Sequence, residues 1–307
     1  MAAEPTKDAR IRRQIITGTA ANGIGKIIVL VTWFFLTPFI LRQLGIEQYG
    51  LWVLVGSIVA YGSLLDFGIG GAVVKYVAEH RSRNDVEKAR ALIATSLWLY
   101  CGLGLLAIVV SIVLASLFPI VFHLSPEQSV TARWLVIVMG INVGVALPGA
   151  VASSVLKGLQ RYEITNIIST VALFVSAIAT VVVLLLGGGV VAMVTVNIPI
   201  TLAVQIPSIL AIRRIAPDLR FSWRGARRDL AWEVLSFSSS LFLNDVAGRL
   251  QSKTDELVIA ASMAVSAVAP YSIARKLSEA AQLLTEQFLK VLLPIASSLR
   301  ASQGERI

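Results

Sequence analysis

Long apolar runs separated by short polar segments dominate the chain. Eight of them supply the roughly 20 residues that a helix needs to cross the hydrocarbon core of a bilayer. They lie near residues 15–41, 51–73, 91–118, 132–156, 164–187, 189–212, 233–259 and 269–296. The first six hold few charges, whereas the last two carry several acidic and basic side chains. The pattern predicts an all-α, polytopic integral membrane protein, a bundle of about eight transmembrane helices.

Composition favours the same fold class. Hydrophobic residues make up 56% of the 307 residues and charged residues 15%. A soluble domain has about 45–50% apolar and about 25% charged residues. The apolar surplus must therefore face lipid. The basic N-terminal segment resembles the start of a signal peptide, but the apolar run behind it continues to about Leu41. That is longer than a signal peptide's apolar region, so we expect an uncleaved first helix.

Basic residues lie in short clusters on alternate sides of the predicted helices. Seventeen Lys and Arg residues precede the first helix or follow the second, fourth and sixth, whereas the other loops have only Arg42 and Arg133. Cytoplasmic loops of membrane proteins carry such an excess. We therefore expect both termini in the cytoplasm. The net charge of +9 follows this topology pattern, so nucleic acid is not an expected partner.

Two charged residues lie inside the first two predicted helices. Lys26 and Asp66 come to nearly the same depth when each residue rises 1.5 Å. Intramembrane charges usually pair or face a cavity, so a Lys26–Asp66 ion pair is one interpretation. In the other, Lys26 extends to the headgroups and Asp66 simply ends its helix.

The last two runs carry charges at helical spacing. Asp245, Arg249 and Lys253 recur every four residues and so share one helix face. We favour a hydrated cavity on that face over an amphipathic helix lying at the interface. In the eighth run, Arg275 and Glu279 are spaced for an ion pair within the helix, as are Glu286 and Lys290.

Signatures of enzymes and metal sites are missing from the sequence. Cys101 is the single cysteine, and His80 and His123 lie far apart. The sequence has no P-loop, no Gly-x-Ser-x-Gly motif and no zinc motif. We therefore expect neither catalysis nor a metal or other cofactor. Gly140 and Gly144, spaced as in close-packed transmembrane helices, predict a packing role.

An internal repeat links the two ends of the chain. The segment "LGIEQYGLWVLVGSI" aligns with "MAVSAVAPYSIARKLSEA" when Tyr49 is set against Tyr271. This alignment brings Lys26 beside the position of Arg249. Duplicated helical halves are typical of secondary transporters, whose binding sites lie between the repeats.

Three segments resemble the polysaccharide-export flippases. They are "LRQLGIEQYGLWVLVGSIVAYGSLLDFGIGGAVVKYVAEH", "LKGLQRYEITNIIS" and "DELVIAASMAVSAVAPYSIARKL", in the order that the family shows. The family comprises the Wzx-type lipid-linked oligosaccharide flippases of the multidrug/oligosaccharidyl-lipid/polysaccharide exporter superfamily. The motif residues in the loops are Gly45, Tyr49, Gly50, Gly158, Gln160 and Arg161.

The resemblance implies a V-shaped transporter of the bacterial inner membrane with a central cationic cavity. The cavity of such a flippase binds the pyrophosphate and sugars of an undecaprenyl-linked O-antigen, capsule or exopolysaccharide unit, while the lipid tail stays among the membrane lipids. The matching positions make Lys26, Arg249 and Lys253 the expected substrate-binding residues. Asp66 and Asp245 are the expected counter-ions, or carriers of a coupling proton or sodium ion.

The chain departs from this family in length. Family members have twelve to fourteen helices, so residues 1–230 match a complete six-helix lobe and residues 231–307 only two helices of a second one. We expect a C-terminally truncated chain; the alternative is a short protein that completes its cavity by dimerisation. The rival functions are a related drug/cation antiporter and, more distantly, a membrane-embedded polysaccharide polymerase.

Overall fold

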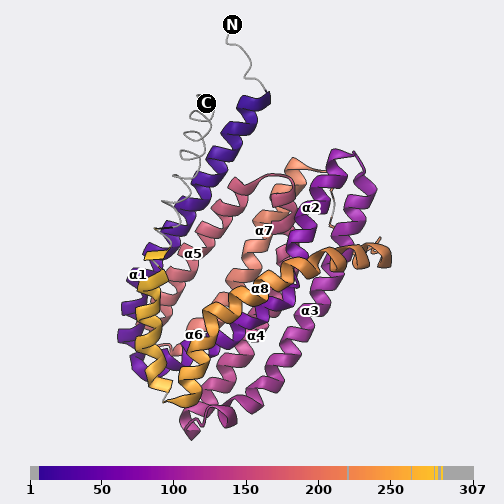
Figure 1. Cartoon of the computed structure of the whole chain (residues 1–307). Coiled ribbons are helices and arrows are strands. Elements are labelled where there is room, and N and C mark those ends of the chain that lie inside the picture. The colour runs from indigo at the N-terminus through magenta and orange to yellow at the C-terminus, as the bar shows by residue number, and fades with distance from the viewer. Residues whose placement is uncertain (1–6, 220, 264, 280, 283–284, 286–307) are drawn as a thin grey trace, which may run out of the picture.

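The computed structural model describes residues 7–219, 221–263, 265–279, 281–282 and 285, and in this part of the chain it is helical without strands. The elements are α1 Lys7–Gly62, η1 Ser63–Asp66, α2 Ile69–Ser82, α3 Val86–Val121, α4 Pro126–Gly158, α5 Tyr162–Leu185, α6 Val190–Thr195, α7 Asn197–Ile215, α8 Arg228–Ser262 and η2 Val265–Ala267. Residues 268–279 form a further helix. Figure 1 shows these helices as one elongated bundle.

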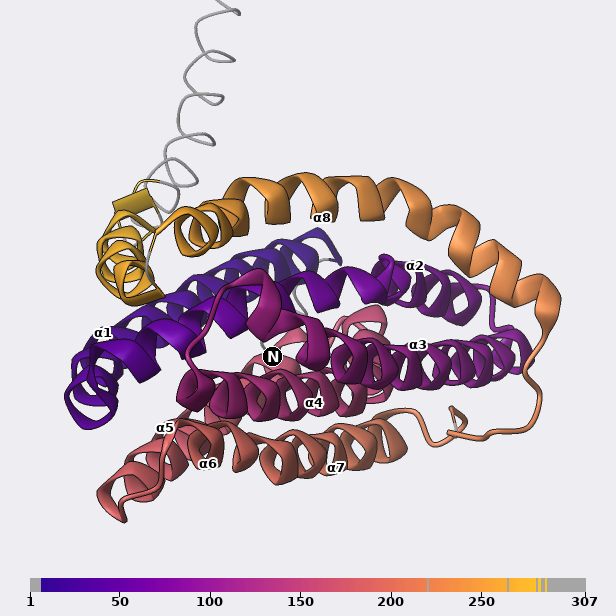
Figure 2. The same cartoon turned by 90° about the horizontal axis from the view of Figure 1, so that it is seen from below.

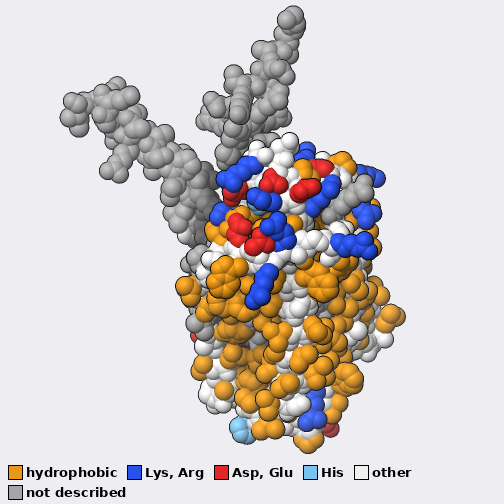
Figure 3. Space-filling model, turned by 90° about the vertical axis from the view of Figure 1, so that its right-hand side faces the viewer, with side chains coloured by type: hydrophobic (Ala, Val, Ile, Leu, Met, Phe, Trp, Pro, Cys, Tyr) orange, Lys and Arg blue, Asp and Glu red, His pale blue; other side chains and the backbone are white. Residues whose placement is uncertain are grey.

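The expected membrane fold is confirmed. Five helical segments of the described chain are long and apolar enough to cross a membrane: Ile27–Ser82, Val86–Val121, Pro126–Gly158, Tyr162–Leu185 and Val190–Ile215. Large apolar side chains such as Leu105, Ile112 and Ile178 are exposed on these helices, as expected for surfaces that contact lipid. Charged side chains gather at one end of the bundle, above a broad apolar band (Figure 3).

The first two predicted helices form a hairpin that turns at Gly45 inside α1. Gly45 has φ 77° and ψ 169° and is the non-helical residue of α1. This backbone conformation is essentially restricted to glycine. A Cβ atom at Gly45 would meet no atom within 4 Å, so the need for glycine here is conformational rather than steric.

The prediction of a continuous second helix over 51–73 is wrong. The helix breaks after Gly62, passes through η1, and restarts as α2 at Ile69. Phe67 and Gly68 at the break have left-handed backbone conformations, with φ of 48° and 74°. The apolar pattern did not predict this break because one charged residue, Asp66, does not by itself interrupt a long apolar run. Asp66 is the last residue of η1.

Helices α3 and α4 cross in close contact at small residues. A Cβ atom on Gly140 would lie only 1.9 Å from Ser111 Oγ, and one on Gly144 would lie 2.7 Å from the Gly104 carbonyl oxygen. Side chains at these glycines would push the two helices apart. The predicted packing role of Gly140 and Gly144 is confirmed.

The turns at the ends of α3 follow from local capping groups. The Asp85 carboxylate accepts a hydrogen bond from the Lys88 backbone N–H (3.1 Å), the main reason why the pKa of Asp85 lies below its ordinary value. At the other end, Ser125 and Gln128 form a capping box at the start of α4. Between α5 and α6, Gly187 adopts φ 80° and ends the helix at the boundary between the predicted runs 164–187 and 189–212.

Helix α8 crosses the outside of the bundle diagonally and packs against α1, α2 and α3 (Figures 1 and 2). It contains the predicted run 233–259 and begins near the end of the bundle where charged residues gather. Because α8 carries many charged residues, it is not one of the five segments that are apolar enough to cross a membrane. After a short turn the chain returns along α1 as the helix of residues 268–279.

Candidate functional site

Polar side chains meet where α1 contacts the C-terminal helices. We call this set the interhelical polar cluster. Its members are Thr37, Tyr49, Ser57 and Tyr61 of α1, Thr254, Asp255 and Glu256 of α8, and Tyr271, Arg275, Lys276 and Glu279 of the following helix. The cluster lies among residues that the apolar pattern assigns to the membrane.

Lys276 is the central cation of the cluster. Its ammonium group donates to Thr37 Oγ1 (3.0 Å) and to the Tyr49 hydroxyl (3.2 Å). It also lies 5.3 Å from the ring centroid of Trp33 and 6.0 Å from that of Trp52, within the range of cation–π attraction. These contacts together compensate for the water that the ammonium group loses.

Glu256 is the buried carboxylate of the cluster. It accepts a hydrogen bond from the Ser57 hydroxyl of α1, and the Arg275 guanidinium lies 3.8 Å away. Arg275 also donates to Glu279 (3.0 Å), which confirms the predicted pair within the eighth helix. A buried charge needs such partners to offset its lost hydration.

Two further hydrogen bonds extend the cluster along α8. The Tyr61 and Thr254 hydroxyls lie 3.0 Å apart, and the Tyr271 hydroxyl donates to Asp255 (2.7 Å). These polar contacts therefore join α1 to two C-terminal helices that are far from it in sequence. Separating the helices would expose charged groups to the space between them, as a transport pathway for a polar substrate requires.

Asp66 occupies a second polar site, at the break between η1 and α2. The Tyr100 hydroxyl of α3 donates to its carboxylate. Gly70 faces the same site, since a Cβ atom there would lie 3.2 Å from Ser154 Oγ and 3.3 Å from the Tyr100 hydroxyl. Asp66 thus ends its helical segment, as one of the two interpretations predicts, and also contacts α3.

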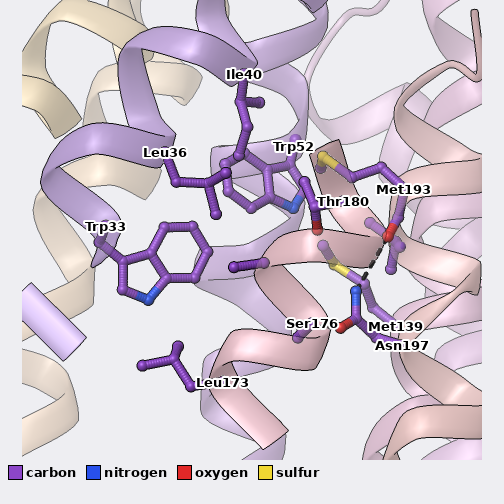
Figure 4. A pocket seen from close by; sticks show the side chains of 12 residues that line it. Trp33, Leu36, Ile40, Trp52, Met139, Leu173, Ser176, Thr180, Met193 and Asn197 are labelled. Carbon is purple, nitrogen blue, oxygen red and sulfur yellow. Dashed lines mark hydrogen bonds between the residues drawn. The ribbon is translucent and has the colours of Figure 1, made fainter. Parts of the chain in front are cut away.

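An apolar cavity of about 240 Å³ lies between α1, α4, α5 and α6–α7 (Figure 4). Trp33, Leu36, Ile40 and Trp52 of α1 line one side. The polar groups on the other side bind one another: Ser176 donates to Asn197, and Asn197 donates to the Met193 carbonyl (3.0 Å). The stacked rings of Trp33 and Trp52 separate this cavity from Lys276.

The three predicted cations lie on α1 and α8, which pack side by side. Lys26 belongs to α1, and Arg249 and Lys253 to α8, together with Asp245. The side chains of these four residues lie outside the described part of the structure, as does the Glu286–Lys290 pair. The Lys26–Asp66 pair and the charged face of α8 therefore remain predictions.

The motif residues from the resemblance occupy turns and helix contacts. Tyr49 joins the interhelical polar cluster, and Gly50 is buried beside it in α1. Gly158 ends α4 so close to α2 that a Cβ atom would lie 3.0 Å from the Val74 carbonyl. Gln160 has φ 59° in the α4–α5 turn, and Arg161 pairs with Glu163 (3.4 Å). Most of these residues shape the backbone.

Sequence analysis assigned no role to Lys276 or Glu256. Both were visible as charges in weakly apolar runs, but their partners on α1 lie about 200 or more positions away along the chain. No spacing rule reaches that far. The sequence signal was the presence of intramembrane charges alone, which indicates a polar site without locating its partners.

Within the described residues, no group of three His, Cys, Asp or Glu residues is placed to hold a metal ion.

A comparison with solved structures finds a protein with a similar fold. A solved structure, described as MATE in complex with MaD3S, superimposes with a TM-score of 0.63 at 17% sequence identity. The match covers 76% of this chain and 53% of that one, so this chain spans about half the length of its structural relative. A comparison with curated proteins gives no match.

The family comparison covers nearly the whole chain. The model of the family "Polysaccharide biosynthesis protein" matches residues 11–300. The match includes α1, α8 and the helix that follows, and hence every residue of the interhelical polar cluster. Because this match spans most of the sequence, the chain belongs to the polysaccharide biosynthesis protein family.

Proposed function

We propose that the chain is a flippase that moves an undecaprenyl-pyrophosphate-linked oligosaccharide across the inner membrane by alternating access. The cargo would be a repeat unit of O-antigen, capsule or exopolysaccharide. Family membership supports the polysaccharide cargo. The observation that supports the transport mechanism is the interhelical polar cluster, because it joins α1 to the C-terminal helices through hydrogen bonds and an ion pair inside the bundle.

The proposed substrate-binding residues are Lys26, Arg249 and Lys253. A pyrophosphate inside the membrane requires compensating positive charge, and these residues lie on two helices that pack against each other. Asp66 and Asp245 are proposed to neutralise these cations in the empty site or to carry a coupling proton or sodium ion. The lipid tail of the substrate would remain among the membrane lipids.

The proposed orientation places both termini in the cytoplasm. The cation excess of the sequence supports it, and so does the gathering of Lys and Arg side chains at one end of the bundle (Figure 3). The same end holds the turns α2–α3 and α4–α5 and the linker to α8.

A drug/cation antiporter is the second candidate. The described part of the polar cluster contains three acidic residues, Asp255, Glu256 and Glu279, against the two cations Arg275 and Lys276. This balance favours a cationic cargo over an anionic one. The flippase proposal therefore depends on the cations Lys26, Arg249 and Lys253.

Deletion of the gene in its host tests this proposal. The measurements are the amount of surface glycan and the amount of lipid-linked oligosaccharide inside the cell. A flippase defect abolishes the glycan and accumulates the lipid-linked precursor, and the wild-type gene restores export. Normal glycan together with increased sensitivity to cationic drugs would replace the flippase by the antiporter.

The Arg249→Ala variant tests the anion site in the same strain. We expect it to insert into the membrane at the wild-type level but to lose glycan export. The matched control is Arg133→Ala. It removes an exposed arginine near the start of α4, and it should keep export. Export by the Arg249→Ala variant would remove this residue from the site.

A further inference from the structure

The linker between α7 and α8 is fixed against the bundle. Near its start, Arg81 of α2 pairs with the Asp218 carboxylate, and Arg90 of α3 donates to the Asp218 carbonyl. Near its end, the Arg227 backbone N–H donates to Thr95 Oγ1 (2.9 Å). These contacts hold both ends of the linker on the protein surface.

Tryptophan side chains place the linker at the level where the apolar surface begins. Trp98 of α3 donates to the Trp223 carbonyl (3.0 Å), and the two rings meet edge to face at 5.5 Å. Trp98 lies about 12 Å along α3 from Arg90, where the polar start of the helix ends. Trp98, Trp223 and Trp232 are 55%, 54% and 75% exposed. Exposed indoles at this level are typical of the membrane–water interface.

Exposed arginines lie close in sequence to the tryptophans of the linker and of α8. Arg224 and Arg228 are exposed on either side of Arg227, whose guanidinium pairs with Asp229 (2.7 Å). Arg213 and Arg214 add two exposed cations in the last turn of α7. Figure 3 faces the side where α8 begins and shows blue side chains gathered above the apolar band.

We propose that this surface binds the headgroup of an anionic phospholipid. The surface consists of Trp98, Trp223, Trp232, Arg224 and Arg228. Arginine binds phosphate oxygens through two parallel N–H groups, and the neighbouring indoles contact the glycerol and upper acyl region. Charge complementarity selects an anionic lipid over a zwitterionic one. A lipid bound here fixes the linker, and with it the start of α8, to one leaflet of the membrane.

The test measures lipid binding to the purified protein by native mass spectrometry, with phosphatidylglycerol and phosphatidylcholine as probes. The wild type is expected to retain phosphatidylglycerol preferentially. Each arginine near an anionic surface contributes about fivefold in affinity, so Arg224→Gln/Arg228→Gln should weaken phosphatidylglycerol binding about 25-fold. Soluble glycerol phosphate should not compete, because it lacks the acyl chains that the indoles contact.

The matched control removes two charges from the same end of the bundle. Arg83→Gln/Lys88→Gln changes exposed residues of the α2–α3 turn and the start of α3, outside the proposed surface, and should leave phosphatidylglycerol binding within twofold of the wild type. Equal binding of the two lipids by the wild type would overturn the proposal. So would equal losses in the two double variants, since these would indicate attraction by net charge alone.

Discussion

At the scale of single residues, the hydration lost by an ammonium group explains the surroundings of Lys276. Two hydroxyl groups and the faces of two tryptophans replace water around it. All of these partners belong to α1. Lys276 is therefore a strong polar link between α1 and the helix of residues 268–279.

Replacing Lys276 by methionine should destabilise the protein by about 2 kcal/mol, because hydrogen bonds to a charged group are lost while the aliphatic stem remains. Thermal unfolding in detergent micelles measures this loss. Leu277→Ala is the control, since Leu277 is 55% exposed and should change stability by less than about 0.5 kcal/mol. An unchanged stability in Lys276→Met would mean that the link carries no net free energy.

At the scale of helices, a single backbone conformation separates the first two membrane crossings. Replacing Gly45 by alanine should cost about 1–3 kcal/mol, because the side chain disfavours φ 77° and ψ 169°. Gly56→Ala is a matched control: a Cβ atom there also meets nothing within 4 Å, but Gly56 is helical. That substitution should be neutral or stabilising. Equal effects of the two in thermal unfolding would contradict a conformational role for Gly45.

The α3–α4 crossing depends on the small size of the side chains at the contact rather than on a special backbone conformation. Gly140→Ala should destabilise the protein by about 1–3 kcal/mol, because the new methyl group overlaps Ser111. The Ser111→Gly substitution removes the overlapping atoms, so the double variant should regain part of the stability that Gly140→Ala loses. A double-mutant cycle in thermal unfolding measures this coupling. Strictly additive losses would show that the two residues do not interact.

At the scale of the whole molecule, the distribution of charges predicts the orientation in the membrane. In a Cys101→Ser background, His123→Cys and Asn84→Cys lie at opposite ends of the bundle, in the α3–α4 and α2–α3 turns. We expect an impermeant maleimide to label His123→Cys in intact cells and Asn84→Cys only after the membrane is opened. The reverse result would place the termini outside the cytoplasm.

Much of the helical architecture is predictable from the sequence because each membrane-spanning segment must satisfy its backbone N–H and C=O groups with hydrogen bonds of its own helix. The runs 91–118 and 132–156 correspond to α3 and α4, and the α5–α6 turn lies at the predicted boundary between the runs 164–187 and 189–212. The break at residues 63–68 escaped prediction. Phe67, whose left-handed conformation helps to end η1, stacks on Phe242 of α8, and a contact over such a distance leaves no local pattern.

The candidate site, too, was only partly predictable from the sequence. Intramembrane charge alone marked Asp66, Arg275 and Lys276 as residues that need a polar environment. The pairing of Arg275 with Glu279 followed from helical spacing, whereas Tyr100 as the partner of Asp66 did not. The side chains of Lys26, Arg249 and Lys253 lie outside the described structure, so their role remains a prediction.

By itself, the sequence determined that the chain is a helical membrane protein with charges inside its bundle, because apolar run length and side-chain hydration act locally along the chain. Tertiary structure alone decided which charges meet. Lys276 binds Thr37 and Tyr49 because the turn after α8 returns the chain along α1. Glu256 binds Ser57 because α8 itself packs against α1. Such contacts depend on how helices pack, and helix packing is set by side-chain shape over the whole bundle rather than by any local pattern.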